Sequence, residues 1–94
     1  MFFVYILASQ RNGTLYIGRT DDLGFRLEQH RTGSLKGFTW KYGIYRLVYY
    51  EVHPSRETAF VRDRQMKKWR RAWKLELIER FNPASNDLTD DIWI

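Results

Sequence analysis

Two apolar segments near the start of the chain predict a β-hairpin. Phe2 to Ala8 is rich in aromatic and branched residues, and Thr14 to Arg19 repeats that character after a linker that contains Asn12-Gly13. Two such segments joined by an Asn-Gly linker are typical of paired antiparallel strands. Ile44 to Val52 has the same character, so we expect it to form a third strand.

A helix over about residues 21 to 32 is predicted between the second and third strands. Thr20 is placed to cap its start, and Gly33 follows its end. Arg26 and His30 recur at helical spacing with two leucines, so all four share one face of the helix. Both polar side chains should therefore point toward the sheet.

The rest of the domain is predicted to be a loop followed by helices. Residues 33 to 43 contain three glycines and form a basic, aromatic loop. Pro54 and Ser55 stop the third strand and start a second helix, which runs to about Trp73. Residues 74 to 81 then form a further short helix.

Length and composition predict one α+β domain over residues 1 to 82. With 94 residues the chain is near the usual size of a single domain, and 44% hydrophobic residues supply enough apolar surface for one core. Residues 83 to 94 form an acidic C-terminal tail with little periodicity, whose end, Ile92-Trp93-Ile94, could dock on the body.

Composition also excludes several classes of site and location. The chain has no cysteine, so disulfides and cysteine nucleophiles are excluded, and a metal would need oxygen or imidazole ligands. No apolar run approaches the roughly 20 residues of a membrane span, and the start lacks the basic region of a signal peptide. We therefore expect a cytoplasmic location and no membrane partner.

The net charge of +5 hides an asymmetry along the chain. All 16 basic residues lie in the first 81 positions, together with 8 acidic residues, and seven of the basic residues lie between Arg62 and Lys74. Such a field favours a polyanion, nucleic acid above all, although a solvated helix face or an acidic protein partner is also open. The side chains that we expect to contact nucleic acid are Arg19, Lys36, Lys41, Lys67, Lys68, Arg70 and Arg71.

Asp63 lies on the apolar side of the predicted second helix, on the stripe that contains Ala59, Met66 and Trp73. We expect that stripe to be buried, and a buried charge is costly unless it is compensated. Asp63 could pair with a basic residue, bind a metal, or face a cleft that is open to water. The candidate bases are Arg19, Arg26 and the arginines of its own helix.

Tyr5 and Tyr16 lie on partner strands of the predicted hairpin, facing the helix that carries Arg26 and His30. Phenol and imidazole can relay a proton, and a guanidinium can hold a phosphate oxygen. Aromatic cross-strand pairs also stabilise hairpins without any chemistry, so a structural role is open as well. Gly18 lies at the far end of the second strand, and a glycine within a strand often marks the close approach of another group.

Val4-Tyr5-Ile6 and Tyr16-Ile17-Gly18, followed by a helix with Arg26 and His30, resemble the two signature tripeptides and the first helix of the GIY-YIG endonuclease superfamily. The chain is similar to the short single-domain bacterial branch of that superfamily, over about residues 1 to 82. The resemblance implies a small three-stranded antiparallel sheet flanked by helices. It also implies an enzyme that cuts DNA phosphodiester bonds with one divalent metal.

The resemblance further implies roles for single residues. Tyr5 and Tyr16 match the motif tyrosines, Gly18 matches the motif glycine, and Arg26 and His30 match functional residues of the helix. In the implied reaction Arg26 neutralises charge on the phosphate, and one of the tyrosines, assisted by His30, orients or deprotonates a water. Which tyrosine does so is left open.

Asp63 stands where the family has its metal-binding glutamate. It would hold Mg²⁺ or Mn²⁺ through a side chain that is one methylene shorter. The alternative function is therefore a nucleic-acid-binding module of the same fold with weak catalysis or none. The form of the nucleic acid and the oligomeric state are left open.

Overall fold

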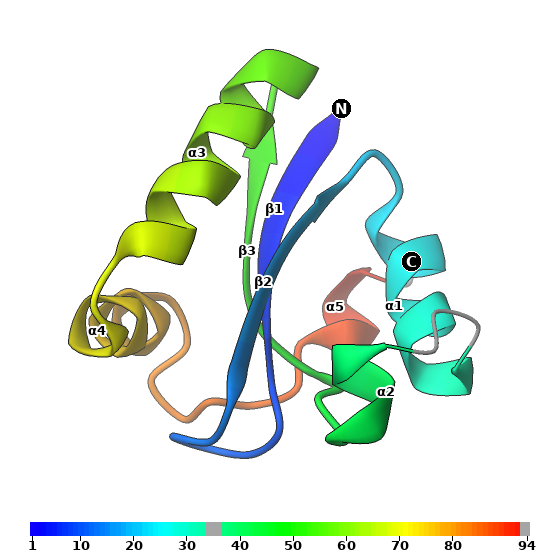
Figure 1. Cartoon of the computed structure of the whole chain (residues 1–94), viewed down its shortest axis with the longest axis vertical. Coiled ribbons are helices and arrows are strands. Elements are labelled where there is room, and N and C mark those ends of the chain that lie inside the picture. Colours follow the sequence, from blue (N-terminus) through cyan, green and yellow to red (C-terminus); the bar gives the residue numbers. More distant parts are fainter. Residues whose placement is uncertain (34–36, 93–94) are drawn as a thin grey trace.

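The structure is a computed structural model that describes residues 1–33 and 37–92. Its described strands form one antiparallel sheet in the order β2-β1-β3, with β1 (Phe2–Ala8) at the centre (Figure 1). β2 (Leu15–Thr20) and β3 (Arg46–His53) are the edge strands. The predicted α+β fold with a three-stranded antiparallel sheet is confirmed. The start of β3 is a correction, because Ile44 is buried ahead of the strand instead of forming its first residue.

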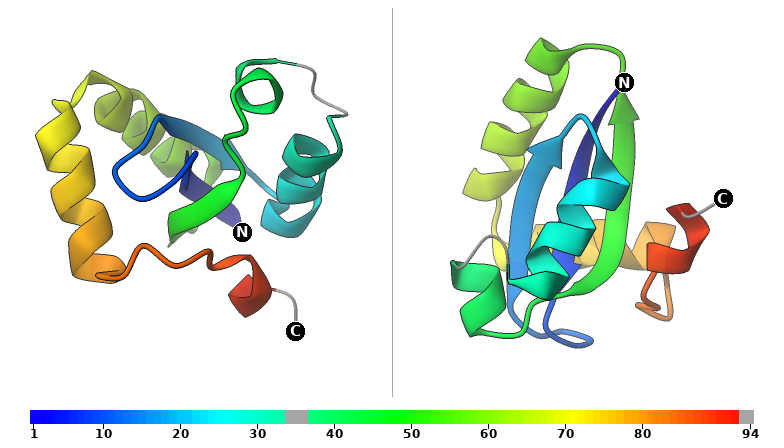
Figure 2. Two further views of the ribbon diagram at one scale, coloured as in Figure 1. Left: turned by 90° about the horizontal axis from the view of Figure 1, so that it is seen from below. Right: turned by 90° about the vertical axis from the view of Figure 1, so that its right-hand side faces the viewer.

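Helices cover both faces of the sheet (Figure 2). α3 (Arg56–Lys68) and α4 (Arg71–Phe81) lie on one face, and α1 (Leu23–Thr32), α2 (Phe38–Lys41) and α5 (Thr89–Ile92) lie on the other. Side chains alternate along β1, as they must along any strand. Val4 therefore packs with Met66 of α3, whereas Tyr5 packs with Leu27 of α1.

The start of α1 corrects the prediction that Thr20 is its cap. Asp22 caps the helix instead, and its Oδ1 accepts a hydrogen bond of 3.0 Å from the Phe25 backbone N–H. Thr20 is still paired with Phe3 in the sheet, and its hydroxyl accepts from the Asp22 backbone N–H at 3.1 Å and donates to the Asp22 carbonyl at 3.2 Å. Gly33 ends α1 in the left-handed conformation, with φ 78°.

The second helix also ends earlier than predicted. α3 stops at Lys68, and Trp69 and Arg70 are extended, with ψ values of 151° and 150°, before α4 begins. α4 contains the residues predicted as a separate short helix, and it turns away from α3 across the sheet (Figure 2).

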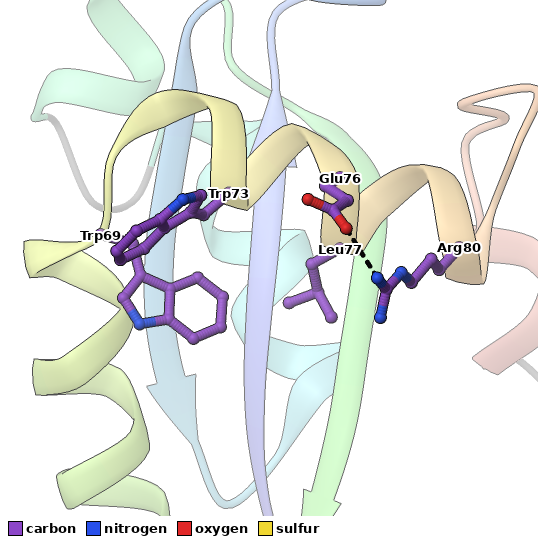
Figure 3. Close-up of a pocket in the computed structure, with 5 residues that line it drawn as sticks. All are labelled: Trp69, Trp73, Glu76, Leu77 and Arg80. Carbon is purple, nitrogen blue, oxygen red and sulfur yellow. Dashed lines mark hydrogen bonds and ion pairs between the residues drawn. The ribbon is translucent and has the colours of Figure 1, made fainter.

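The early end of α3 changes the position of Trp73. Because Trp73 belongs to α4, the prediction that it is buried is wrong, and its side chain is 51% exposed. It lines a surface pocket with Trp69 and Leu77, beside the ion pair between Glu76 and Arg80 (Figure 3). Ala59, Asp63 and Met66, the other members of the predicted stripe, are buried.

The predicted loop over residues 33 to 43 contains the short helix α2. Its Thr39 is buried and faces α1. Lys36, which we expect to contact nucleic acid, lies outside the described residues.

The acidic segment after Asn82 packs on the body of the protein. The Leu88 backbone N–H donates to the Leu47 carbonyl at 2.8 Å, and Asp87 pairs with Arg31 of α1 at 2.8 Å. Ile92 packs against the core cluster on the α1 face, and its neighbours Trp93 and Ile94 lie outside the described residues. Across the ranges 1–33 and 37–92, no helix is long and apolar enough to cross a membrane.

Candidate active site

The β1–β2 register places Tyr5 directly opposite Gly18. A Cβ atom at position 18 would lie 2.5 Å from Tyr5 Oη and 2.6 Å from Tyr5 Cζ. Real Cβ atoms do not approach other atoms so closely, and Tyr5 is only 1% exposed, so its ring has little room to move. Gly18 is therefore required because the Tyr5 side chain lies over it toward the edge of the sheet.

A chain of hydrogen bonds joins Tyr5 to α1 and α2. Tyr5 Oη lies 3.1 Å from His30 Nε2, and His30 Nδ1 lies 2.7 Å from Thr39 Oγ1. The sequence predicts the proximity of Tyr5 and His30 but not the contribution of Thr39. A buried threonine in an otherwise exposed aromatic and basic segment is the signal that could have identified it.

Tyr16 completes the aromatic part of the site. Its ring centroid lies 5.3 Å from that of His30 and 6.4 Å from that of Tyr5. Tyr16 is only partly buried, in contrast to Tyr5. Of the two motif tyrosines, Tyr16 is therefore the one that a substrate can reach.

Burial determines the protonation states of Tyr5 and His30. It raises the pKa of Tyr5 well above its usual range, and the neighbouring Tyr16 adds to the effect. Burial and the charge of Arg26 lower the pKa of His30. At neutral pH Tyr5 is therefore a neutral phenol, and His30 is a neutral imidazole with one N–H and one acceptor nitrogen.

Arg26 and Arg19 meet at the C-terminal end of β2. Both line a hollow of about 140 Å³, together with Arg56 from the start of α3. The buried Nε of Arg26 has no hydrogen-bond partner among the described residues. A buried donor with no partner is costly, and an anion in the hollow would stabilise the Arg26 guanidinium, although the Asp21 carboxylate lies in the same wall. Arg56 is a residue that the sequence prediction missed, because it stands far along the chain from the other arginines of the hollow.

Asp63 is completely buried on the opposite face of the sheet from Tyr5. Arg19 Nη1 lies 2.5 Å from Asp63 Oδ2, and Lys67 Nζ lies 3.2 Å from the same oxygen. Pairing with Arg19 was one of the predicted alternatives, whereas Lys67 was not among the predicted bases. Two cations thus compensate one buried carboxylate.

The second oxygen of Asp63 determines whether a divalent metal fits. Lys67 Nζ lies 3.1 Å from Asp63 Oδ1, but this oxygen accepts no hydrogen bond in the part of the chain that the structure describes. In the same residues there is no cluster of three metal-binding side chains. Mg²⁺ commonly binds to one or two carboxylates and keeps several waters, so the completely buried Asp63 would serve as a single protein ligand only after the Lys67 ammonium moves aside and water enters.

The other cations predicted to contact nucleic acid are exposed but differ in their contacts. Arg70 lies over the Trp73 ring at 5.6 Å, and Lys41 lies over the Tyr42 ring at 5.5 Å. Arg71 Nη2 donates to the Asn12 and Gly13 carbonyls, both at 2.6 Å, so it joins α4 to the hairpin turn. Lys68 is exposed near the end of α3.

Comparison with known proteins identifies the family to which this sequence belongs. The sequence profile described as the GIY-YIG catalytic domain matches residues 1–76. The chain belongs to the GIY-YIG family. GIY-YIG nucleases act on nucleic acid and generally depend on a divalent metal.

Two kinds of relative extend this result. UPF0213 proteins of Staphylococcus aureus, from strains Mu50 and N315 among others, are 34% identical over 77 residues, which cover 82% of this chain and 93% of theirs. The solution structure of the UPF0213 protein BH0048 from Bacillus halodurans superposes with a TM-score of 0.58 at 30% identity and covers 96% of each chain. The predicted membership of the short bacterial branch of the GIY-YIG family is confirmed.

Proposed function

We propose that this protein is a divalent-metal-dependent endonuclease that hydrolyses DNA phosphodiester bonds. The observation that carries the proposal is the hollow at the end of β2. Its wall contains Arg19, Arg26 and Arg56, and the Arg26 Nε is buried without a partner among the described residues. Guanidinium groups that converge on one small space suit a phosphate group.

The neighbouring groups support a hydrolytic role. Arg26 neutralises the charge that develops on the phosphate oxygens, which is commonly a large contribution to catalysis. Tyr16, the accessible tyrosine, orients the attacking water at the edge of the sheet. Tyr5 stays protonated and bonds to one ring nitrogen of His30 while Thr39 bonds to the other, so that the imidazole is fixed beside Tyr16.

A divalent ion held by Asp63 would polarise the phosphate and stabilise the leaving oxygen. Asp63 would supply Oδ1, which accepts no hydrogen bond among the described residues but lies 3.1 Å from the Lys67 ammonium, and Arg19 links this carboxylate to the hollow.

The test is a nicking assay on supercoiled, linear and branched DNA with Mg²⁺, Mn²⁺ or EDTA. We expect nicking in the presence of metal and none in EDTA. Arg26→Gln should lower the rate roughly 100- to 1,000-fold, as the loss of one preorganised donor does in other hydrolases. DNA affinity of each variant is measured in EDTA, so that a loss of binding is separated from a loss of chemistry. No metal-dependent cleavage by the wild-type protein on any of these DNAs would refute the proposal.

The alternative is a nucleic-acid-binding module without catalysis, and one observation favours it. The carboxylate in the family's metal-binding position is fully buried and already paired with both Arg19 and Lys67. If DNA binds with the expected salt dependence but metal neither binds nor promotes cleavage, this alternative replaces the endonuclease proposal.

A further inference from the structure

A groove of about 410 Å³ lies on α3 beside the hollow that holds Arg26. It is lined by Arg19, Arg56, Glu57, Phe60 and Val61. Arg19 and Arg56 also line the hollow, so the two spaces share a wall. Whatever occupies the groove is therefore the immediate neighbour of whatever occupies the hollow.

Phe60 is the central apolar residue of this groove. Phe60 is 43% exposed, and the adjacent Val61 is 52% exposed. Both apolar side chains lie outside the buried side of α3, which carries Ala59, Asp63 and Met66. Two guanidinium groups flank the ring, with Arg19 Cζ at 4.6 Å and Arg64 Cζ at 5.7 Å from its centroid. Both guanidinium groups lie over the ring, so a base would stack on it in place of the more distant one, Arg64, and would be surrounded by positive charge.

The chemistry of the groove matches the three parts of a nucleotide. The Phe60 ring offers a face for a base, and Arg19, Arg56 and Arg64 offer charge for its phosphate. The Glu57 carboxylate, on the groove wall, can accept a hydrogen bond from an amino group on a base edge. A base that is paired within a duplex is stacked on its neighbours and cannot present its face to a side chain.

We propose that the groove around Phe60 binds an unpaired nucleobase next to the phosphate in the Arg26 hollow. The position of this base relative to the phosphate rests on the proposed function, whereas the binding itself does not. The proposal assigns the substrate class: nucleic acid with a single-stranded, flapped or extruded nucleotide beside the cleaved bond.

The pocket formed by Trp69 and Trp73 offers a matched control (Figure 3). Trp73 is 51% exposed and has Arg70 over its ring at 5.6 Å, so it resembles Phe60 in type and surroundings. The two charged residues of that pocket, Glu76 and Arg80, pair with each other at 2.6 Å. The pocket shares none of its lining residues with the hollow.

The experiment uses short DNA that contains the fluorescent base 2-aminopurine, with EDTA present so that no cleavage occurs. One probe carries 2-aminopurine in a single strand, a second carries it paired in a blunt duplex, and a third single strand carries an abasic site at that position. Affinity and fluorescence are measured for the wild type and for Phe60→Ala, Phe60→Tyr and Trp73→Ala. Thermal unfolding of each variant checks that it is folded.

We expect the wild-type protein to quench the single-stranded probe and not the duplex probe. Phe60→Ala should weaken binding of the single-stranded probe roughly 5- to 150-fold, the range that the loss of one aromatic stacking partner produces. Phe60→Tyr should keep the quenching, because it keeps the ring, and Trp73→Ala should match the wild type. On the abasic probe, wild type and Phe60→Ala should bind equally.

Equal affinity of wild type and Phe60→Ala for the single-stranded probe would overturn the proposal. So would base-dependent binding that is lost in Trp73→Ala and kept in Phe60→Ala. Because these measurements need no cleavage, failure of the nicking assay with intact base-dependent binding would refute only the endonuclease proposal. Nicking without base-dependent binding at Phe60 would refute only the groove.

Discussion

The Lys67 ammonium lies 3.1 Å from Asp63 Oδ1, the carboxylate oxygen that accepts no hydrogen bond within the described residues. Lys67 is one helical turn after Asp63, and its side chain is 49% exposed, so it can leave the carboxylate without disturbing the core. A divalent cation that binds Asp63 must replace this ammonium or bind beside it, and Lys67 therefore opposes metal binding by charge and by position.

Replacing Lys67 should thus strengthen metal binding. Lys67→Gln keeps most of the side-chain length and removes the charge, and we expect it to raise Mn²⁺ affinity roughly 3- to 10-fold. The measurement is the free Mn²⁺ concentration, followed by its electron paramagnetic resonance signal, in protein without DNA. Lys68→Gln makes the same change of charge at the next position along α3 and serves as the control. Equal Mn²⁺ affinity in the two variants would show that Lys67 does not compete with the metal.

The length of the side chain at position 63 gives a second prediction. Asp63→Glu restores the methylene of the family's usual ligand, and we expect it to raise the nicking rate roughly 10- to 30-fold, which corresponds to about one or two kcal/mol. Asp63→Ala should abolish nicking, and Mn²⁺ should recover part of the wild-type deficit because it tolerates less regular coordination. The three rates are compared in Mg²⁺ and Mn²⁺ at matched DNA occupancy. If the Glu and Ala variants are both as slow as wild type, Asp63 has no part in the reaction.

Gly18→Ala tests the close approach of Tyr5. The new Cβ would lie 2.5 Å from Tyr5 Oη, and the buried ring cannot swing out, so we expect a loss of roughly 1–3 kcal/mol in the free energy of unfolding. Urea denaturation measures the loss. Tyr5→Leu removes the atoms that clash, so the double variant should lose less than the sum of the two single losses. Strictly additive losses would mean that Gly18 is needed for another reason.

The low pKa of His30 gives a prediction about pH. Burial and Arg26 lower the pKa of His30 in the folded protein, whereas in the unfolded chain it returns to about 6.5. As the pH falls below about 6.5, the unfolded chain takes up the proton first, so His30 should reduce stability increasingly until the pH reaches its folded pKa.

The measurement is urea denaturation from about pH 7 to about pH 5, compared between wild type and His30→Gln. We expect the free energy of unfolding to fall more steeply in the wild type, because the variant has no group at position 30 that titrates. The remaining titratable groups, including Asp87 and Glu51, are common to both proteins. Parallel curves would contradict the lowered pKa.

The sequence predicts best those features that depend on local pattern. The apolar segments Phe2 to Ala8 and Thr14 to Arg19 predict the hairpin, and helical spacing turns His30 toward the sheet, which is enough to bring Tyr5 beside His30. The left-handed Gly33 likewise marks the end of α1. These elements are stabilised by the same short-range preferences that the sequence pattern reports.

Features that depend on tertiary packing could not be predicted in the same way. Trp69 and Arg70 carry no helix-breaking signal, yet the chain leaves the helix there so that α4 can cover the sheet. The pairing of Lys67 with Asp63 depends on the depth at which α3 packs. The bond between Thr39 and His30 depends on how α2 folds back on α1, and glycine-rich segments give little indication of such a path.

The two hydrogen bonds from Arg71 to the hairpin turn affect the order in which the fold is completed during synthesis. The guanidinium that binds the Asn12 and Gly13 carbonyls follows them by 59 and 58 positions in the chain. Until Arg71 has been synthesised those carbonyls depend on water, although β3 precedes Arg71 and can already pair with β1 of the hairpin. A nascent chain that ends before α4 can therefore pair all three strands, but it lacks the bonds that fix the hairpin turn to the helices behind it.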